Sequence, residues 1–278
     1  MGRVTARRKV VRFSGPRRSE RVDTLIVEEP LELRVGGESL MVTMRTPGDD
    51  FDLAAGFLVS EGAVAASGDI ETMRFCAGTD ETGANTYNLL DIRLTPGVEV
   101  PSAAKRLFTT TAACGVCGKE SVEDIRTRAR WSVAEDPLRL APETLAALPD
   151  RLRAAQRLFD KTGGLHAAGL FTADGELIAA REDVGRHNAV DKLIGRALRE
   201  DRLPLRETVL VVSGRASFEL VQKAVMAGVP ALAAVSAPSS LAAELAAEAG
   251  LTLAGFLRGD TMNVYARPDR VADGPSSG

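Results

Sequence analysis

Residues 208–256 read TVLVVSGRASFELVQKAVMAGVPALAAVSAPSSLAAELAAEAGLTLAGF, and their alternation sets the architecture. Three apolar segments of strand length alternate with two segments of helical periodicity: Thr208–Val212, Phe218–Met226, Ala231–Val235, Leu241–Ala249 and Leu251–Phe256. Short apolar strands separated by helices are typical of a sheet with both faces covered. The stretch therefore predicts an α/β domain in which a sheet lies between layers of helices.

The pattern continues on both sides of this stretch. Upstream, Pro142 opens a helical pattern that contains Pro149, which predicts a kink or a split into two helices. A hairpin over 166–180 and a helix from about Asn188 to Leu198 follow, and Asn263 to Ala266 form a last short strand. We therefore place the α/β main domain at residues 140–268.

The first part of the chain predicts a smaller α+β unit, residues 23–125. Two alternating segments flank Gly36-Gly37 and predict a hairpin, and a helical pattern follows Asp50. The unit ends in a loop that carries two cysteines, and we expect a hinge at residues 124–142. Residues 1–22 are rich in Arg and Lys, with Glu20 as the lone acid, which favours a disordered solvated tail. A mobile basic arm that meets an anionic partner is the alternative. Residues 269–278 predict a second disordered tail.

Composition excludes several classes of protein. The chain has 278 residues and a formal net charge of -3, which argues against nucleic acid as a partner. No apolar run reaches the roughly 18 residues that a membrane span needs, so we expect no membrane partner. Three cysteines do not make a disulfide framework, and the N-terminus lacks the apolar segment of a secretory signal. We therefore expect a cytoplasmic protein.

Two of the three cysteines, Cys114 and Cys117, form a C-x-x-C pair with a glycine after each. Such a pair can exchange between dithiol and disulfide, hold half of a zinc site, or carry sulfur on one thiolate. A zinc site would need Cys76 and a histidine as well, and neither a second C-x-x-C nor the signature of a zinc deaminase is present. We therefore expect no resident metal.

The glycines that flank the pair favour one of the two remaining roles. In thioredoxin-like exchange the motif opens a helix, but Gly115 and Gly118 are poor helix formers. A mobile loop suits a sulfur carrier, because a persulfide must reach both a donor and an acceptor. Lys119 would lower the pKa of a nearby thiol and so favour the reactive thiolate. A chance C-x-x-C in a turn is the alternative without function.

Small polar residues and arginines follow the predicted strands of the main domain. In α/β sheets, ligands bind beyond the carboxyl ends of the strands, and exposed N–H groups with an arginine favour an anion such as phosphate. The alternative without a binding function is that these Ser and Gly residues only cap helices and form turns, as they commonly do. Three such loops in succession predict a binding crevice, with these candidate residues: Ser213, Gly214, Arg215, Ser236, Arg258, Gly259 and Asp260.

A second polar segment spans residues 181–192, REDVGRHNAVDK, between a strand and a helix. It predicts either a salt-bridged helix start or a polar wall of the site in which His187 donates a proton or contacts the ligand. His166 lies in an apolar strand, which is more typical of a buried, hydrogen-bonded histidine.

Several of these segments together resemble one family, the formate dehydrogenase accessory sulfurtransferases (FdhD family). The resemblance covers roughly residues 25 to 267 and keeps the order of the family's motifs. It rests on these stretches: 45–50 (RTPGDD), 110–119 (TTAACGVCGK), 182–192 (EDVGRHNAVDK), 213–217 (SGRAS), 236–240 (SAPSS) and 255–260 (GFLRGD).

The resemblance implies a fold, a reaction and a set of partners. Members take sulfur from a cysteine desulfurase as a persulfide and sulfurate the molybdenum bis(molybdopterin guanine dinucleotide) cofactor before it enters formate dehydrogenase. The resemblance implies that Cys114 is the cysteine that carries the persulfide and that Cys117 is its partner. The cofactor-binding stretch, with its GDP-like guanine nucleotide moiety, corresponds to Phe256, Leu257, Arg258, Gly259, Asp260 and Thr261. The family also implies a homodimer and a three-layer mixed sheet that resembles the cytidine deaminase fold without its zinc.

Two other functions fit the same residues. A thiol–disulfide oxidoreductase would use the cysteine pair as a redox switch. A non-catalytic molybdenum cofactor chaperone would protect and deliver the cofactor without carrying sulfur.

Overall fold

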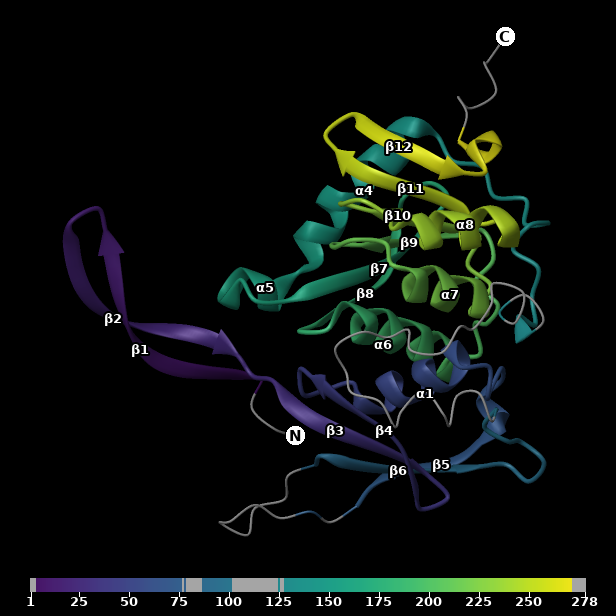
Figure 1. The fold of residues 1–278 in the computed structure, drawn as a ribbon, viewed down its shortest axis with the longest axis horizontal. Helices are drawn as coiled ribbons and strands as arrows, with labels where there is room; N and C mark the ends of the chain where they lie inside the picture. Colours follow the sequence, from purple (N-terminus) through teal and green to yellow (C-terminus); the bar gives the residue numbers. More distant parts are fainter. Residues whose placement is uncertain (1–3, 77, 79–86, 102–124, 126–127, 272–278) are drawn as a thin grey trace.

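The computed structural model describes residues 4–76, 78, 87–101, 125 and 128–271 of the chain. Within these residues it contains a six-stranded sheet, a four-stranded sheet and a two-stranded ribbon (Figure 1). Among the described helices, none combines the length and the apolar character that crossing a membrane requires. The mixed α/β class expected from the sequence is confirmed, whereas the resemblance to cytidine deaminase stays a prediction.

The six-stranded sheet has the order β12-β11-β10-β9-β7-β8. β9, β10 and β11 are parallel, and β7, β8 and β12 each run antiparallel to a neighbour. The strands are β7 (His166–Thr172), β8 (Leu177–Asp183), β9 (Thr208–Val212), β10 (Ala231–Ala234), β11 (Thr252–Arg258) and β12 (Thr261–Ala266). Every residue of β9 and β10 is buried, as a sheet covered on both faces requires.

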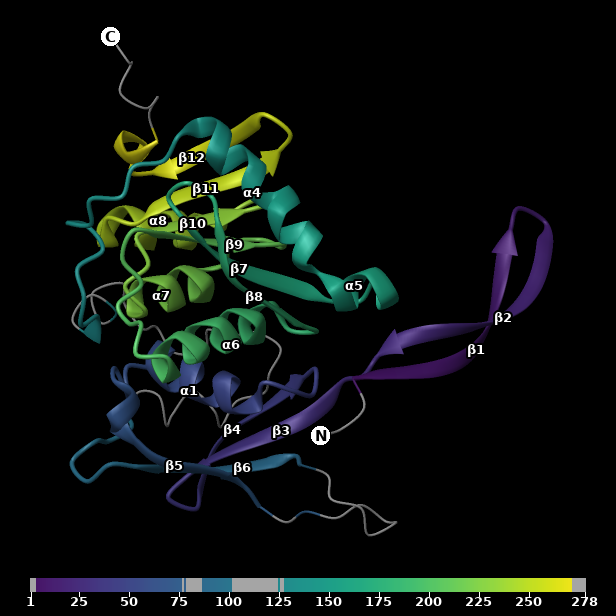
Figure 2. The ribbon, with the colours of Figure 1, turned by 180° about the vertical axis from the view of Figure 1, so that it is seen from behind.

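Helices cover both faces of this sheet, which gives three layers (Figures 1 and 2). One face packs against α6 (Arg186–Arg199), α7 (Phe218–Met226) and α8 (Ser240–Ala249), and the other against α4 (Pro142–Ala155). The two faces of the sheet belong to two hydrophobic cores, and alternate residues of β9 point into each. Leu210 and Val212 pack in the core on the side of α6, α7 and α8, and Val209 and Val211 pack in the core on the side of α4. The strand periodicity read from the sequence therefore divides the core as expected.

The helix that opens at Pro142 does not break where the sequence predicts. α4 continues through Pro149 and ends at Ala155, and α5 (Arg157–Thr162) begins after Gln156. Gln156 has φ -83 and ψ 71, outside the helical region, and its N–H bonds to the carbonyl of Arg153. The break therefore lies one residue before α5, at a glutamine rather than at the proline.

The N-terminal part forms a four-stranded sheet of order β4-β3-β6-β5. Its elements are β3 (Glu29–Val35), β4 (Glu38–Arg45), α1 (Asp50–Ser60), a short 3₁₀ turn η1 (Ser67–Asp69), β5 (Ile70–Phe75) and β6 (Leu89–Leu94). The predicted hairpin is confirmed, because Gly36 and Gly37 turn the chain with φ of 59 and 85. α1 lies between this sheet and α6, and one hydrophobic core includes residues of both parts (Figure 1).

Two glycines let α1 and α6 touch backbone to backbone. A methyl group placed on Gly56 of α1 would overlap the carbonyl oxygen of Asp191, and one on Gly195 of α6 would overlap the carbonyl oxygen of Asp52. The contact is reciprocal, since the backbone nitrogen of each glycine lies next to the site of the other's missing methyl group. The close approach explains two glycines in helix interiors, where this residue otherwise lowers stability.

The basic N-terminal segment is ordered over most of its length, contrary to the prediction for residues 1–22. β1 (Thr5–Ser14) and β2 (Arg17–Ile26) pair antiparallel as a two-stranded ribbon that projects from the body (Figure 1). Gly15 has a φ of 58 and precedes Pro16, a combination suited to a two-residue hairpin turn. Charge density alone predicted disorder, but Val10, Val11, Phe13 and Val22 lie among the basic residues, and β-branched and aromatic residues favour a strand.

The prediction of a disordered tail over residues 269–278 is also wrong for the first residues of that range. Arg270, in the short turn η2 (Pro268–Arg270), is fully buried and donates hydrogen bonds to the carbonyls of Val133, Ala134 and Asp136 at 2.6, 3.0 and 3.2 Å. These bonds also fix residues 133–136, which the sequence placed in a hinge. Residues 272–278 lie outside the described part of the chain.

Candidate functional site

A cavity of about 640 Å³ lies at the carboxyl edge of the parallel strands. Residues at the carboxyl ends of β9, β10 and β11 form one wall, and residues of α4, of α5 and of the segment between α5 and β7 form the other. It is lined by Ala146, Pro149, Asp150, Leu152, Arg153, Gln156, Phe159, Gly163, Gly164, Leu165, His166, Val184, Ser213, Val235, Leu257, Arg258 and Gly259. The volume suits a small organic ligand, and the position is where α/β sheets bind ligands.

Backbone hydrogen bonds join the three loops that the sequence singled out. The N–H of Ser236 donates to the carbonyl of Gly214 at 3.4 Å, and the N–H of Phe256 donates to the carbonyl of Ser236 at 3.2 Å. Residues far apart in the chain therefore lie side by side at the carboxyl edge, as the parallel order of the strands predicts.

The predicted residues divide into those that line the cavity and those beside it. Ser213, Leu257, Arg258 and Gly259 line it, and the Ser213 hydroxyl accepts a hydrogen bond from the N–H of Ala167 at 2.9 Å. The others do not line the cavity: Gly214, Arg215, Ser236, Phe256, Asp260 and Thr261. Their assignment as ligand contacts stays a prediction.

A bulge in β11 directs Arg258 toward the cavity. The pairing of β11 with β12 shifts between Gly255 and Arg258, and Phe256 adopts a φ of 55, which is unfavourable for a residue with a side chain. Leu257 is buried, whereas Phe256 is 47% exposed. Bulges of this kind redirect side chains next to binding sites. Arg258 forms no ion pair within the described residues, so its guanidinium is available to an anion.

His166 lies in the cavity wall rather than in the core where the sequence placed it. Burial lowers the pKa of His166, and the charges of Arg186 and His187 lower it further. Its imidazole is therefore neutral at physiological pH and has one donor and one acceptor nitrogen. Within the described part of the chain, neither ring nitrogen has a hydrogen-bond partner.

His187 does not line this cavity. Its Nε2 lies 2.9 Å from a carboxylate oxygen of Glu219 and 3.2 Å from the hydroxyl of Ser217, where α6 and α7 begin. Burial raises the pKa of Glu219, but the hydrogen bond from His187 and the nearby positive charges outweigh burial and leave it below the ordinary value. The role of His187 as a ligand contact stays a prediction.

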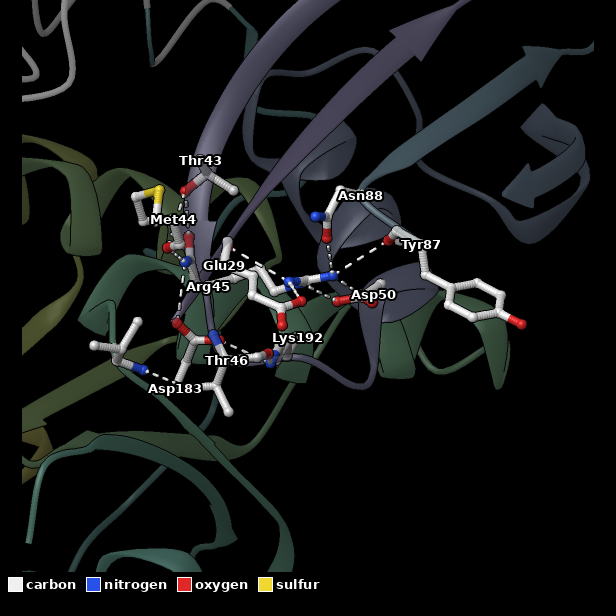
Figure 3. Close-up of polar contacts among 12 residues, drawn as sticks. Glu29, Thr43, Met44, Arg45, Thr46, Asp50, Tyr87, Asn88, Asp183 and Lys192 are labelled. Carbon is white, nitrogen blue, oxygen red and sulfur yellow. Dashed lines mark hydrogen bonds and ion pairs between the residues drawn. The ribbon is translucent and has the colours of Figure 1, made fainter. Parts of the chain in front are cut away.

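The rest of the polar segment 181–192 holds the two parts of the protein together (Figure 3). Asp183 is fully buried, and its carboxylate lies 2.7 Å from Nζ of Lys192, accepts from the N–H of Thr46 at 3.1 Å and from the amide of Asn188 at 3.0 Å. Lys192 in turn donates to the carbonyl of Thr46 at 2.9 Å. Of the two predictions for this segment, the salt-bridged helix start is the one that fits Asp183 and Lys192.

A second buried ion pair lies beside the first. Arg45, at the end of β4, is 1% exposed and donates through Nε to the carboxylate of Asp50 at 2.9 Å (Figure 3). Its Nη2 also reaches the carbonyl of Tyr87 and the side chain of Asn88. The stretch 45–50 therefore fixes the start of α1.

Sequence reasoning missed the wall of the cavity formed by α4 and α5. Arg153 lies over the ring of Phe159, 4.8 Å from its centre, and pairs with Asp160 at 2.6 Å. Glu182 accepts from the N–H groups of Leu158 and Phe159 at 2.9 and 2.8 Å, so a carboxylate already caps the start of α5. The amphipathic pattern gave no signal for this wall, because it is typical of any surface helix.

Of the three cysteines, Cys114 and Cys117 lie outside the described residues. Cys76, which follows β5, is half-buried, and its N–H donates to the carbonyl of Leu89 at 2.9 Å. Among the residues that the structure describes, no group of three or more His, Cys, Asp or Glu side chains could hold a metal ion.

The fold and the cavity define a class: a three-layer α/β protein with a ligand-sized crevice at the carboxyl edge of a mixed sheet. Residues 26–272 match the model of the FdhD/NarQ family, and the chain belongs to this family. The family match begins at the end of β2, so the two-stranded ribbon lies almost entirely outside it.

Curated relatives match nearly the whole chain. It is 64% identical over 274 residues to the sulfur carrier protein FdhD of Streptomyces coelicolor, covering 98% of this chain and 97% of the relative. It is 56% identical over 275 residues to the protein of the same name from Mycobacterium tuberculosis, covering 98% and 100%. A solved structure of a candidate formate dehydrogenase accessory protein from Desulfotalea psychrophila has a TM-score of 0.75 at 23% identity, covering 97% of this chain and 100% of the other, which shows a shared fold.

Proposed function

We propose that this protein is a sulfur carrier that accepts sulfur from a cysteine desulfurase as a persulfide on Cys114. It passes the sulfur to the molybdenum bis(molybdopterin guanine dinucleotide) cofactor, its bound substrate, before the cofactor enters formate dehydrogenase. The observation that carries the proposal is the full-length match, at 64% identity, to a relative named as a sulfur carrier protein. We propose further that it works as a cytoplasmic homodimer, with no resident metal.

The chemistry needs two thiols and no metal of the protein's own. The thiolate of Cys114 attacks the terminal sulfur of the donor's persulfide, which forms a Cys114 persulfide and releases the donor's thiolate. The thiolate of Cys117 then attacks the sulfur of Cys114 and displaces hydrosulfide to the molybdenum. This step reduces the carried sulfur and oxidises the two cysteines to a disulfide, so a dithiol reductant must restore the pair.

The crevice supports the cofactor part of the proposal. A nucleotide's phosphates need positive charge and N–H donors, and Arg258 lies in the cavity wall without an acidic partner among the described residues. The volume of about 640 Å³ holds one nucleotide-sized group and leaves the rest of the cofactor outside.

Replacing Arg258 by alanine is expected to weaken the binding of GDP about tenfold or more, because a charge-assisted contact to phosphate is lost. Isothermal titration calorimetry at fixed ionic strength measures the change. Arg130→Ala removes an exposed arginine outside the cavity and serves as the control. Equal GDP affinity in Arg258→Ala and Arg130→Ala would contradict the assignment of Arg258.

A complementation experiment distinguishes the sulfur carrier from a cofactor chaperone. In cells that lack their own copy of the protein, Cys114→Ala is expected to abolish formate dehydrogenase activity, since no persulfide can form. Cys76→Ala, which removes the cysteine outside the pair, is expected to retain it. If the protein were a chaperone that carries no sulfur, the Cys114→Ala variant would instead support full formate dehydrogenase activity.

A further inference from the structure

The wall between α4 and α5 contains an unusual buried group, the side-chain amide of Gln156. Gln156 is 4% exposed and lines the cavity. Its backbone is fully used, since its N–H donates to the carbonyl of Arg153 and its carbonyl accepts from the N–H of Asp160. Its side-chain amide has no hydrogen-bond partner within the described residues.

Neither amide atom of Gln156 is among the enclosed side-chain atoms that lack a partner, so the amide is accessible from the cavity and free to hydrogen-bond with a ligand there. Gln156 caps no helix with its side chain and interrupts α4 instead of extending it. The break matters for geometry: with its backbone outside the helical region, Gln156 places its side chain in the cavity wall rather than on the solvent face of a continuous helix.

The chemistry of the amide defines what it can recognise. A glutamine side chain offers a donor and an acceptor next to each other and carries no charge. His166, which also lines the cavity without a hydrogen-bond partner among the described residues, is held neutral, whereas the carboxylate of Asp150 on α4 is exposed at the rim. Phosphate would be served by Arg258 on the opposite wall, and the N–H groups at the start of α5 are already taken by Glu182. The α4–α5 wall therefore suits a neutral ring edge with an adjacent N–H and C=O.

We propose that Gln156 reads the lactam edge, an adjacent ring N–H and C=O, of a purine or pteridine ring bound in the cavity. The proposal rests on the proposed function, since guanine and pterin both present this edge and both occur in the cofactor. Phe159, held by Arg153, supplies an apolar ring beside the same wall. Gln156 thus determines specificity for the ring, and Arg258 supplies affinity for the phosphates.

The experiment compares Gln156→Leu with wild type in binding GDP, ADP and neopterin. GDP affinity is expected to fall about tenfold, since one neutral hydrogen-bond pair is lost. The weaker affinity for ADP, which has no lactam, is expected not to change. A matching loss for neopterin would identify the pteridine as a source of the edge, and a loss for GDP alone would identify the guanine.

Thermal denaturation without ligand separates a binding role from a structural one. Gln156→Leu is expected to leave the Tm nearly unchanged, because the amide forms no hydrogen bond within the described residues that the substitution would remove. The control is Gln222→Leu, which alters the chain's only other glutamine, a residue that is buried in α7 away from the cavity and is not without an interaction partner. It is expected to lower the Tm and to leave GDP affinity unchanged.

The outcomes separate this inference from the function on which it rests. If wild type binds GDP and Gln156→Leu binds it equally well, the inference is overturned and the proposed function stands. If wild type binds none of the three probes, the crevice does not hold the cofactor and both are overturned. If Gln156→Leu fails to fold, Gln156→Met, which is similar in length and has no amide, replaces it, and unchanged GDP affinity in that variant overturns the inference.

Discussion

Gly195→Ala is expected to destabilise the protein by about 3 kcal/mol or more, although alanine is the better helix former by about 1 kcal/mol. The added methyl group would overlap the carbonyl oxygen of Asp52 and crowd the backbone nitrogen of Gly56. Backbone atoms cannot move aside as a flexible side chain can, so α1 and α6 must separate, and the core they share must loosen. Thermal denaturation should show a Tm lower by about 6 °C or more.

The control is a glycine of the same chain with open space around it. No atom lies within 4 Å of the position of a methyl group on Gly68, which is exposed in the turn before β5. Gly68→Ala is expected to leave the Tm unchanged or slightly higher, because alanine restricts the unfolded chain. Equal stability of Gly195→Ala and Gly68→Ala would contradict the direct contact between the two helices.

Asp183→Ala is expected to cost about 3–5 kcal/mol of unfolding free energy, because it leaves the buried ammonium group of Lys192 without its counter-charge. The substitution also removes the acceptor for the N–H of Thr46 and for the amide of Asn188. Urea denaturation measures the loss. Since Thr46 belongs to the N-terminal part and Asp183 to the main domain, both parts should lose stability together.

An exposed ion pair at the C-terminal end of α6, the helix that carries Lys192, provides the comparison. Arg196 and Glu200 also lie 2.7 Å apart, but both side chains are about 40% exposed. Glu200→Ala is expected to leave the urea midpoint almost unchanged, because water screens the pair. Similar losses of stability in Asp183→Ala and Glu200→Ala would contradict the expectation that a buried ion pair matters more than an exposed one.

The alternation of residues 208–256 correctly predicted a sheet covered by helices on both faces, because strand and helix periodicities are local properties of the sequence. The crevice followed from the same pattern, since the carboxyl ends of parallel strands share one edge. Ser213 and Arg258 were therefore predicted from position alone, and both line the cavity.

The misses share a physical cause: they depend on partners distant in the sequence. The polar segment around Asp183 resembles a site wall in its composition, and only the fold shows that its charges pair across two parts of the protein. Arg270 gave no signal, because its five carbonyl contacts come from other segments. Gln156 looked like an ordinary surface position, since the break between α4 and α5 was expected at Pro149.

The most direct test of the sulfur-carrier proposal is the intact mass of the protein after incubation with a cysteine desulfurase and cysteine. Wild type and Cys117→Ala are expected to gain the mass of one sulfur atom, removable by reductant, whereas Cys114→Ala gains none. A loss of two hydrogens in wild type without added sulfur would contradict the proposal and identify a disulfide switch instead. An unchanged mass in all three proteins would contradict it in favour of a chaperone.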